Sequence, residues 1–112
     1  MITITTRSDL RGGDVGTARF VGAEHSSGVS FFWVDAPEGT GPDLHVHPYT
    51  ETWVVLKGEA LVEADGEERR ISAGDVVTVT AGTRHQFRGA SAENVEMVCI
   101  HASPRMIQEN LE

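Results

Sequence analysis

The stretch GTGPDLHVHPYTETWVVLKG, residues 39–58, decides how the rest of the chain is interpreted. His45 and His47 are two residues apart, so on an extended backbone both side chains leave the same face, roughly 7 Å apart along the strand. Glu51 opens the run ETWVVLK, whose β-branched and aromatic content predicts a strand. A kink or bulge in the intervening Pro-Tyr-Thr would return Glu51 to the face of the histidines. Two neutral imidazoles and a carboxylate there suit a divalent transition metal.

Length, composition and charge limit the class of protein. A chain of 112 residues is long enough for a real core, and we expect one domain over residues 1–112. Hydrophobic residues make up 39% of the chain, which also has 12 glycines, and this is typical of a globular protein with many turns. The formal net charge of −8 argues against a nucleic-acid or anionic-membrane partner, because both attract basic patches.

The cysteine content and the first residues bear on the compartment. The single cysteine, Cys99, lies in an apolar run and is expected to be a small core residue. The first ten residues, MITITTRSDL, have no basic segment followed by an apolar one. No segment approaches the roughly 18 apolar residues of a membrane span. We therefore expect a cytoplasmic protein.

Most of the chain is predicted to form short strands. Alternating or β-branched patterns predict strands over residues 2–5, 17–22, 29–34, 51–57, 59–64, 67–71, 76–80, 85–88 and 95–101. Residues 7–15 are predicted to be a loop. Asp65-Gly66 between two alternating segments is a strong signal for a β-hairpin. So many short strands, with Gly and Asp turns between them, indicate an all-β sandwich or barrel of antiparallel strands.

Only the carboxy-terminal end departs from the strand pattern. Ser103 followed by Pro104 is a typical N-cap and first-turn pair of a helix. Three apolar residues from Met106 onward fall at helical spacing. These signals predict a short closing helix over residues 104–111.

The opening stretch resembles the first motif of the cupins, small double-stranded β-helix (jelly-roll) barrels. That motif is a Gly, five residues, His-x-His, three or four residues, Glu, six residues and Gly. These positions are held here by Gly39, His45, His47, Glu51 and Gly58.

Residues 74–89 resemble the second cupin motif, which is a Gly, five residues, Pro-x-Gly, two residues, His, three residues and Asn. The opening glycine, Gly82 and His85 match this pattern. Thr80 stands in the position of the Pro, and Gly89 in that of the Asn. Both departures fall on turn and framework positions, so the ligand position at His85 is intact.

The resemblance implies that His45, His47, Glu51 and His85 together hold one divalent metal inside the barrel, with Fe, Mn, Ni and Zn as candidates. Three histidines and one carboxylate leave one or two open positions on a five- or six-coordinate ion, which separates a catalytic site from a closed structural one. The resemblance also implies a homodimer, and residues 1–6 are a plausible exchanged strand.

Other residues are expected near the metal. His101 ends a strand and is a candidate proton carrier, with an ordinary strand-end histidine as the alternative. Tyr49, beside the metal loop, is a candidate gate or simply a cover. Strand parity with the expected ligands predicts three residues on the wall of the pocket, namely Trp53, Val55 and Phe87.

Cupins include dioxygenases, isomerases, decarboxylases, cyclases, metal-free epimerases and ligand-binding domains, and the fold alone chooses none of them. We expect a metal-dependent enzyme of the dioxygenase, isomerase or cyclase type, possessing oxidoreductase or isomerase chemistry and acting on a small oxygen-bearing molecule. One alternative is a non-enzymatic module that binds or senses a small molecule. Another is a metal-free scaffold that keeps the motif by descent.

Overall fold

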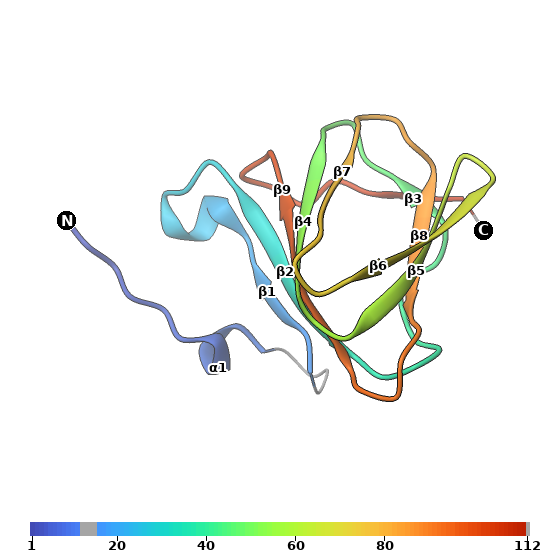
Figure 1. The fold of residues 1–112 in the computed structure, drawn as a ribbon. Helices are drawn as coiled ribbons and strands as arrows, with labels where there is room; N and C mark the ends of the chain where they lie inside the picture. Colours follow the sequence, from blue (N-terminus) through green and yellow to red (C-terminus); the bar gives the residue numbers. More distant parts are fainter. Residues whose placement is uncertain (12–15, 112) are drawn as a thin grey trace.

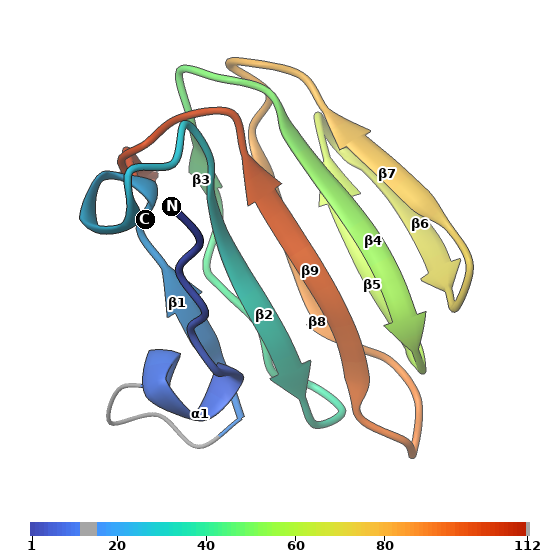
Figure 2. The ribbon, with the colours of Figure 1, turned by 90° about the vertical axis from the view of Figure 1, so that its left-hand side faces the viewer.

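The computed structural model describes residues 1–11 and 16–111, and in this part of the chain two antiparallel sheets face each other (Figure 1). The first sheet has the strand order β1-β2-β9-β4-β7 and is seen face on in Figure 2. The second sheet has the order β10-β3-β8-β5-β6. This arrangement is the predicted jelly roll, because apart from β1-β2 and β5-β6 the strands that are neighbours in each sheet are not consecutive in the sequence.

The described residues form ten strands and two short helices. The strands are β1 Ala18–Phe20, β2 Ser30–Ala36, β3 His45–Val46, β4 Glu51–Lys57, β5 Glu59–Ala64, β6 Glu67–Ser72, β7 Val76–Val79, β8 His85–Gly89, β9 Val95–His101 and β10 Glu109–Asn110. The helices are α1 Arg7–Leu10 and the 3₁₀ helix η1 Gly22–His25. Neither of these helices has the length or apolar content to cross a membrane. The predictions for β4, β5 and β9 are confirmed residue for residue.

The core lies between the sheets because the strands alternate buried and less buried residues. In β9 every second residue from Val95 to His101 is buried, and in β4 the buried positions are Glu51, Trp53 and Val55. Since side chains of a strand alternate between its two faces, these positions all point between the sheets. The interior of the fold therefore holds charged and imidazole groups at one end of the same strands that supply its apolar core.

Two predictions at the amino-terminal end are wrong. Residues 2–5 form no strand, and Ile2 and Ile4 are 89% and 87% exposed, because this segment finds no partner edge among the described residues. The predicted loop over residues 7–15 begins with α1, which Thr6 and Asp9 start by a reciprocal capping box. Residues 12–15 of that prediction lie outside the described residues.

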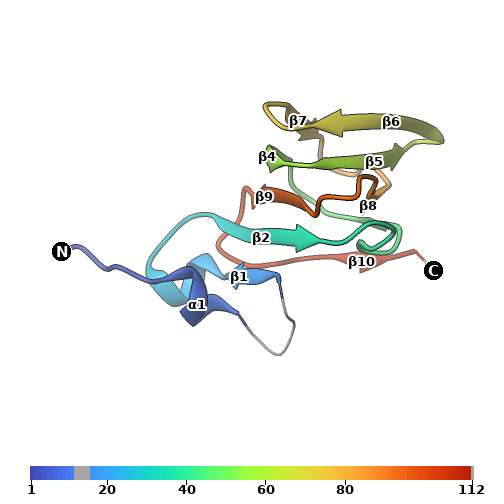
Figure 3. The same cartoon turned by 60° about the horizontal axis from the view of Figure 1, so that its bottom comes forward.

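The predicted helix over residues 104–111 is also wrong, although a short helix does exist, at α1. The segment bends and then forms β10, which pairs antiparallel with β3 at Val46 and His45. The main-chain N–H of Leu111 donates to the carbonyl of Leu44 at 3.1 Å. An eight-residue helix is marginal in water, whereas the edge of β3 offers partners for main-chain groups. Figure 3 shows the two termini at opposite ends of the molecule.

Candidate metal centre

The candidate site is built from two pairs of residues that face each other across the interior. In the first sheet Glu51 on β4 lies directly opposite His101 on β9. In the second sheet His45 on β3 lies directly opposite His85 on β8. His47 follows β3, and all five side chains are buried, with at most 4% exposed. Residues from both walls of the barrel therefore meet at one point.

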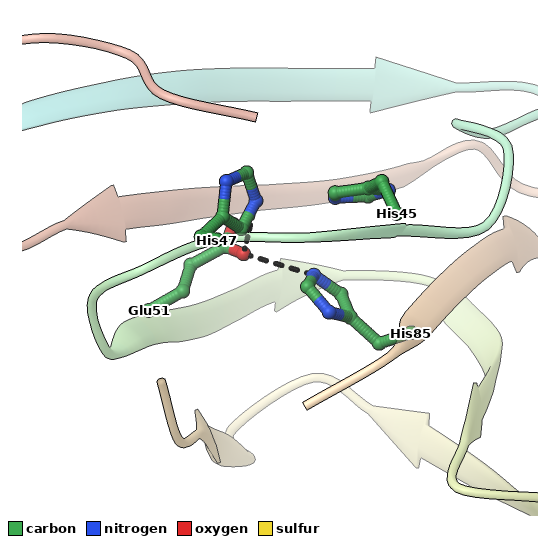
Figure 4. Close-up of side chains that lie close together, drawn as sticks. All are labelled: His45, His47, Glu51 and His85. Atoms are coloured by element: carbon green, nitrogen blue, oxygen red, sulfur yellow. Dashed lines mark hydrogen bonds and ion pairs between the residues drawn. The ribbon is translucent and has the colours of Figure 1, made fainter. Parts of the chain in front are cut away.

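The geometry corrects the expectation that His45, His47 and Glu51 lie on one strand with a bulge between them. β3 ends at Val46 in the second sheet, and β4 begins at Glu51 in the first. Residues 48–50 carry the chain from one sheet to the other. Glu51 thus approaches the histidines from the opposite wall, as the close-up in Figure 4 shows.

One ligand atom from each of His45, His47, Glu51 and His85 lies within 4.8 Å of the other three. The side chains point toward one another in Figure 4. Glu51 Oε1 lies 3.4 Å from His47 Nε2 and 3.2 Å from His85 Nε2. These four residues could hold a metal ion, and they are the set that the sequence motifs single out.

The orientation of the three imidazoles follows from a shared hydrogen-bond pattern. The Nδ1 atoms of His45, His47 and His85 each lie within 2.8 Å of a main-chain carbonyl oxygen, respectively those of Asp43, Ile107 and Thr83. A carbonyl oxygen can only accept, so each Nδ1 carries a hydrogen and donates it. In the neutral ring the lone pair is then on Nε2. The Nε2 of His47 is buried and finds no hydrogen-bond partner in the described part of the chain, so the donor set fits a divalent transition metal.

Burial and the neighbouring groups have opposite effects on the pKa of Glu51 and of His47. Burial alone would raise the pKa of Glu51, but contacts with His101, His47 and His85 outweigh it and hold that pKa well below its usual range. Burial is also the largest influence on His45, and it lowers the pKa of that ring. Burial opposes protonation of His47 too, yet the Glu51 carboxylate and the Ile107 carbonyl outweigh it and raise the pKa. The site therefore contains a buried carboxylate anion that attracts a cation.

His101 and Tyr49 lie together on the far side of the carboxylate. His101 Nε2 is 3.2 Å from Glu51 Oε2, and its Nδ1 is 2.5 Å from the Tyr49 hydroxyl. The Tyr49 ring stacks on His47 at a centroid distance of 5.2 Å. Burial raises the pKa of Tyr49. The structure thus brings both candidate catalytic residues to the site, while Tyr49 is not among the residues that line the cavity.

A cavity of about 440 Å³ opens onto the site. His45, His47, Glu51 and His101 line it at one end. Its apolar wall is formed by Phe32, Val34, Trp53, Phe87 and Cys99.

Two of the three predicted wall residues line this cavity. Trp53 and Phe87 pack edge to face, with ring centroids 5.1 Å apart. Val55 is buried in the core but is not a lining residue, because it lies one inward position further along β4. His85 also lies behind the lining.

Sequence reasoning missed the groups that hold the histidine rings. Two of them have a local signal, because the carbonyls of Asp43 and Thr83 belong to the residue two positions before the histidine they orient. The third, at Ile107, lies 60 residues from His47 and has no signal in the sequence. Phe32, on the cavity wall, was part of a predicted strand with no inward face assigned to it.

Comparison with known proteins identifies the fold and the family. A family model described as "Cupin domain" matches residues 31–101. Quercetin 2,3-dioxygenase of Bacillus subtilis (strain 168) is 34% identical over 73 residues, which cover 62% of this chain and 22% of the enzyme. The chain thus spans less than a quarter of that relative's length.

Two further proteins match over most of their length. The oxalate-binding protein of Thermotoga maritima is 28% identical over 104 residues, covering 88% of this chain and 86% of that protein. A solved structure from Klebsiella pneumoniae, described as an uncharacterized conserved protein with a double-stranded β-helix domain, has a TM-score of 0.75 at 21% identity. It covers 100% of this chain and 99% of its own, and at this identity the likeness shows the fold alone.

Proposed function

This chain belongs to the cupin family, and on that premise we propose that it binds one divalent transition metal through His45, His47, Glu51 and His85 and acts as a metal-dependent enzyme. The observation that carries the proposal is the shared orientation of the three imidazoles. Each ring donates its Nδ1 hydrogen to a main-chain carbonyl oxygen. The Nε2 atom, at the opposite edge of the ring, is therefore the atom that can bind a metal beside the Glu51 carboxylate. A cluster that existed only to satisfy its own polar groups would not leave the buried Nε2 of His47 without a hydrogen bond, at 3.4 Å from the Glu51 carboxylate.

A metal held there would supply a Lewis acid or redox centre for an oxygen-bearing substrate, and the donor set accepts Fe, Mn, Ni and Zn. The other functions of the site would be performed by side chains of the protein. His101 would hold or move a proton at Nε2, with the Tyr49 hydroxyl fixing its other nitrogen. Trp53 and Phe87 would exclude water from the inner wall.

The lining of the cavity favours one class of substrate. None of the lining residues that the structure describes is Lys or Arg, and Asp35 and Glu51 both contribute to the lining. A small dianion would therefore meet no positively charged side chain. A volume of about 440 Å³ with aromatic walls suits a neutral or singly charged molecule with an apolar body and an oxygen-bearing end, such as a phenol or a diketone. The likeness to a quercetin dioxygenase supports this choice.

A second candidate function is binding without turnover. The relative that this chain matches over 88% of its own length is named an oxalate-binding protein. A binding or sensing module would use the same cavity and the same metal. It would saturate with a ligand and convert nothing.

The test of the proposal begins with the metal. Protein purified without a metal-affinity tag would be analysed for its elements and then titrated with Fe, Mn, Ni and Zn. We expect one ion per chain, and we expect His47→Ala to weaken its binding. No bound ion and no affinity on titration would refute the proposal and leave a metal-free scaffold.

The metal-loaded protein would next be screened for turnover of phenols, diketones, sugar phosphates and oxalate. Conversion of a phenol or a diketone is the expected result. Saturable binding of any of these compounds without conversion would favour the binding module instead. Turnover of oxalate alone would contradict the inference from a lining without Lys or Arg.

We also propose that the chain forms a homodimer. The outward face of the first sheet carries a continuous apolar row, formed across four strands by Trp33, Val98, Val54 and Val76. Val76 is 66% exposed, and the apolar side chains of the amino-terminal arm are exposed as well. Covering such a face would remove apolar surface from water. Sedimentation at low micromolar concentration tests this, and a 12.1 kDa species would refute it.

A further inference from the structure

We propose that residues 104–111 form a strap that positions His47 through the main chain of Ile107, and that docking of this strap and binding of the metal are coupled. The inference rests on the proposed metal site. It goes beyond that site, because it assigns a role to a segment that supplies none of the ligands.

The first step is a difference between the three histidines. His45 and His85 each take their orienting carbonyl from the residue two positions earlier, so any movement of the strand moves ring and carbonyl together. His47 takes its carbonyl from Ile107, at an Nδ1 to oxygen distance of 2.7 Å. Its orientation therefore depends on a segment 60 residues away remaining in place.

The second step is that Ile107 holds two groups of the site at once. Its carbonyl accepts from His47, and its N–H donates to the Tyr49 hydroxyl at 3.1 Å. Tyr49 in turn stacks on the His47 ring, with an angle of 11° between the ring planes. The His47 ring is thus fixed at its edge by the strap and on its face by a tyrosine that the strap also holds. Its Nε2 then lies 3.4 Å from Glu51 Oε1, on the side of the proposed metal.

The third step is that the strap is held weakly. Its main anchors are main-chain bonds at its two ends, from Ala23 N–H to the Pro104 carbonyl at 2.8 Å and from Leu111 N–H to the Leu44 carbonyl at 3.1 Å. Between them β10 is only two residues long, and both of its residues are exposed. A segment with few buried contacts and short pairing opens locally at low free energy.

The coupling follows from these contacts. An undocked strap releases His47 Nδ1 but leaves the carbonyls of Asp43 and Thr83 in place, so only one of the three rings loses its orientation. Loss of such an outer partner of a metal-binding histidine typically weakens metal affinity about 10- to 100-fold. Because coupling between two equilibria is reciprocal, the bound metal must stabilise the docked strap by the same factor.

The decisive variant is a chain that stops after Met106. We expect its metal Kd to rise about 10- to 100-fold relative to the full chain, with the β-sheet circular dichroism spectrum retained. Glu109→Ala is the matched control, because this exposed side chain makes no hydrogen bond or ion pair with any described residue, and its Kd should be unchanged. If the shortened chain does not fold, Leu111→Pro in the full chain removes one anchoring N–H and should weaken binding in the same direction.

Hydrogen exchange on the unmodified full chain tests the reciprocal effect. Saturation with the metal should slow exchange of the Ile107 and Leu111 amides by up to the same factor, and leave the Gly74 amide, in the turn after β6, unchanged. A full chain that binds metal, with an unchanged Kd in the shortened chain and unchanged exchange at Ile107, would overturn the inference. A full chain that binds no metal would instead refute the proposed function.

Discussion

Gly41→Ala should destabilise the protein far more than an ordinary glycine-to-alanine change. A Cβ placed on Gly41 would lie 1.8 Å from the carbonyl oxygen of Phe87 and 3.0 Å from the Cα of Arg88. Both are main-chain atoms of β8, so a flexible side chain cannot relieve the clash. The loop formed by residues 37–44 would have to move away from the strand by more than an ångström.

The cost can be worked out from what that movement breaks. Overpacking a well-packed contact typically costs about 1–3 kcal/mol. The loop is also held by two main-chain hydrogen bonds, from Gly39 N–H to the Gly89 carbonyl at 2.8 Å and from Gly89 N–H to the Thr40 carbonyl at 2.9 Å. Each contributes about 0.5–1.5 kcal/mol. We therefore expect Gly41→Ala to lower the free energy of unfolding by about 2–6 kcal/mol.

Urea denaturation of the metal-free chain measures this free energy. Gly28→Ala is the matched control, because a Cβ at Gly28 meets no atom within 4 Å and its φ is not in the left-handed region. That control should be neutral or slightly stabilising, since alanine restricts the unfolded chain. Equal stabilities of the two variants would refute the placement of the loop against β8. Since Gly41 also lines the cavity, the clash should change ligand affinity as well.

Three further predictions concern the site and the core. Trp53→Ala should lower the free energy of unfolding by about 3–5 kcal/mol, because Trp53 is fully buried against Phe87. A loss below about 1 kcal/mol, measured by urea denaturation, would contradict its place in the core. Tyr49→Phe should cost about 1–3 kcal/mol, since His101 Nδ1 loses its partner, and unchanged stability would count against this hydrogen bond. The thermal shift produced by the metal should be larger at a pH well above 6.5 than at a pH below it. His47 has a raised pKa, and while protonated it stabilises the metal-free fold through Glu51 and opposes metal binding; both effects are lost as the pH rises through its folded pKa, which lies above 6.5. An equal shift at both pH values would argue against His47 as a ligand.

Much of the fold and of the candidate site was predictable because both depend on short-range patterns. Side chains of a strand alternate between its two faces, and this alternation placed Trp53 on the inner face of β4. Runs of β-branched residues located most of the strands. The Asp65-Gly66 turn was predicted from the same kind of local rule, and both residues have the positive φ that such a turn requires. The positions of the four expected ligands followed from motif spacing, and their atoms do converge.

What could not be predicted depends on contacts between distant segments. The sequence does not show that the chain changes sheets between His47 and Glu51, because a bulge within one strand has the same residue pattern. It also does not show where residues 104–111 lie. Helical spacing and an N-cap pair describe what this segment would do alone, whereas the free edge of β3 decides what it does in the fold.

Gly89 shows why a departure from a family motif has to be judged in its own structure. The glycine stands where the second cupin motif has an Asn, which by itself weakens the match. In the fold, a Cβ at Gly89 would lie 2.5 Å from the carbonyl oxygen of Pro37 and 3.1 Å from that of Ala36. Pro37 and Ala36 line the cavity. The missing side chain therefore lets these two lining residues approach β8 closely, and Gly41 meets the same strand two residues earlier, at Phe87. Both glycines thus set how closely the residues that line the cavity approach β8, while the histidines and Glu51 determine the chemistry of the site.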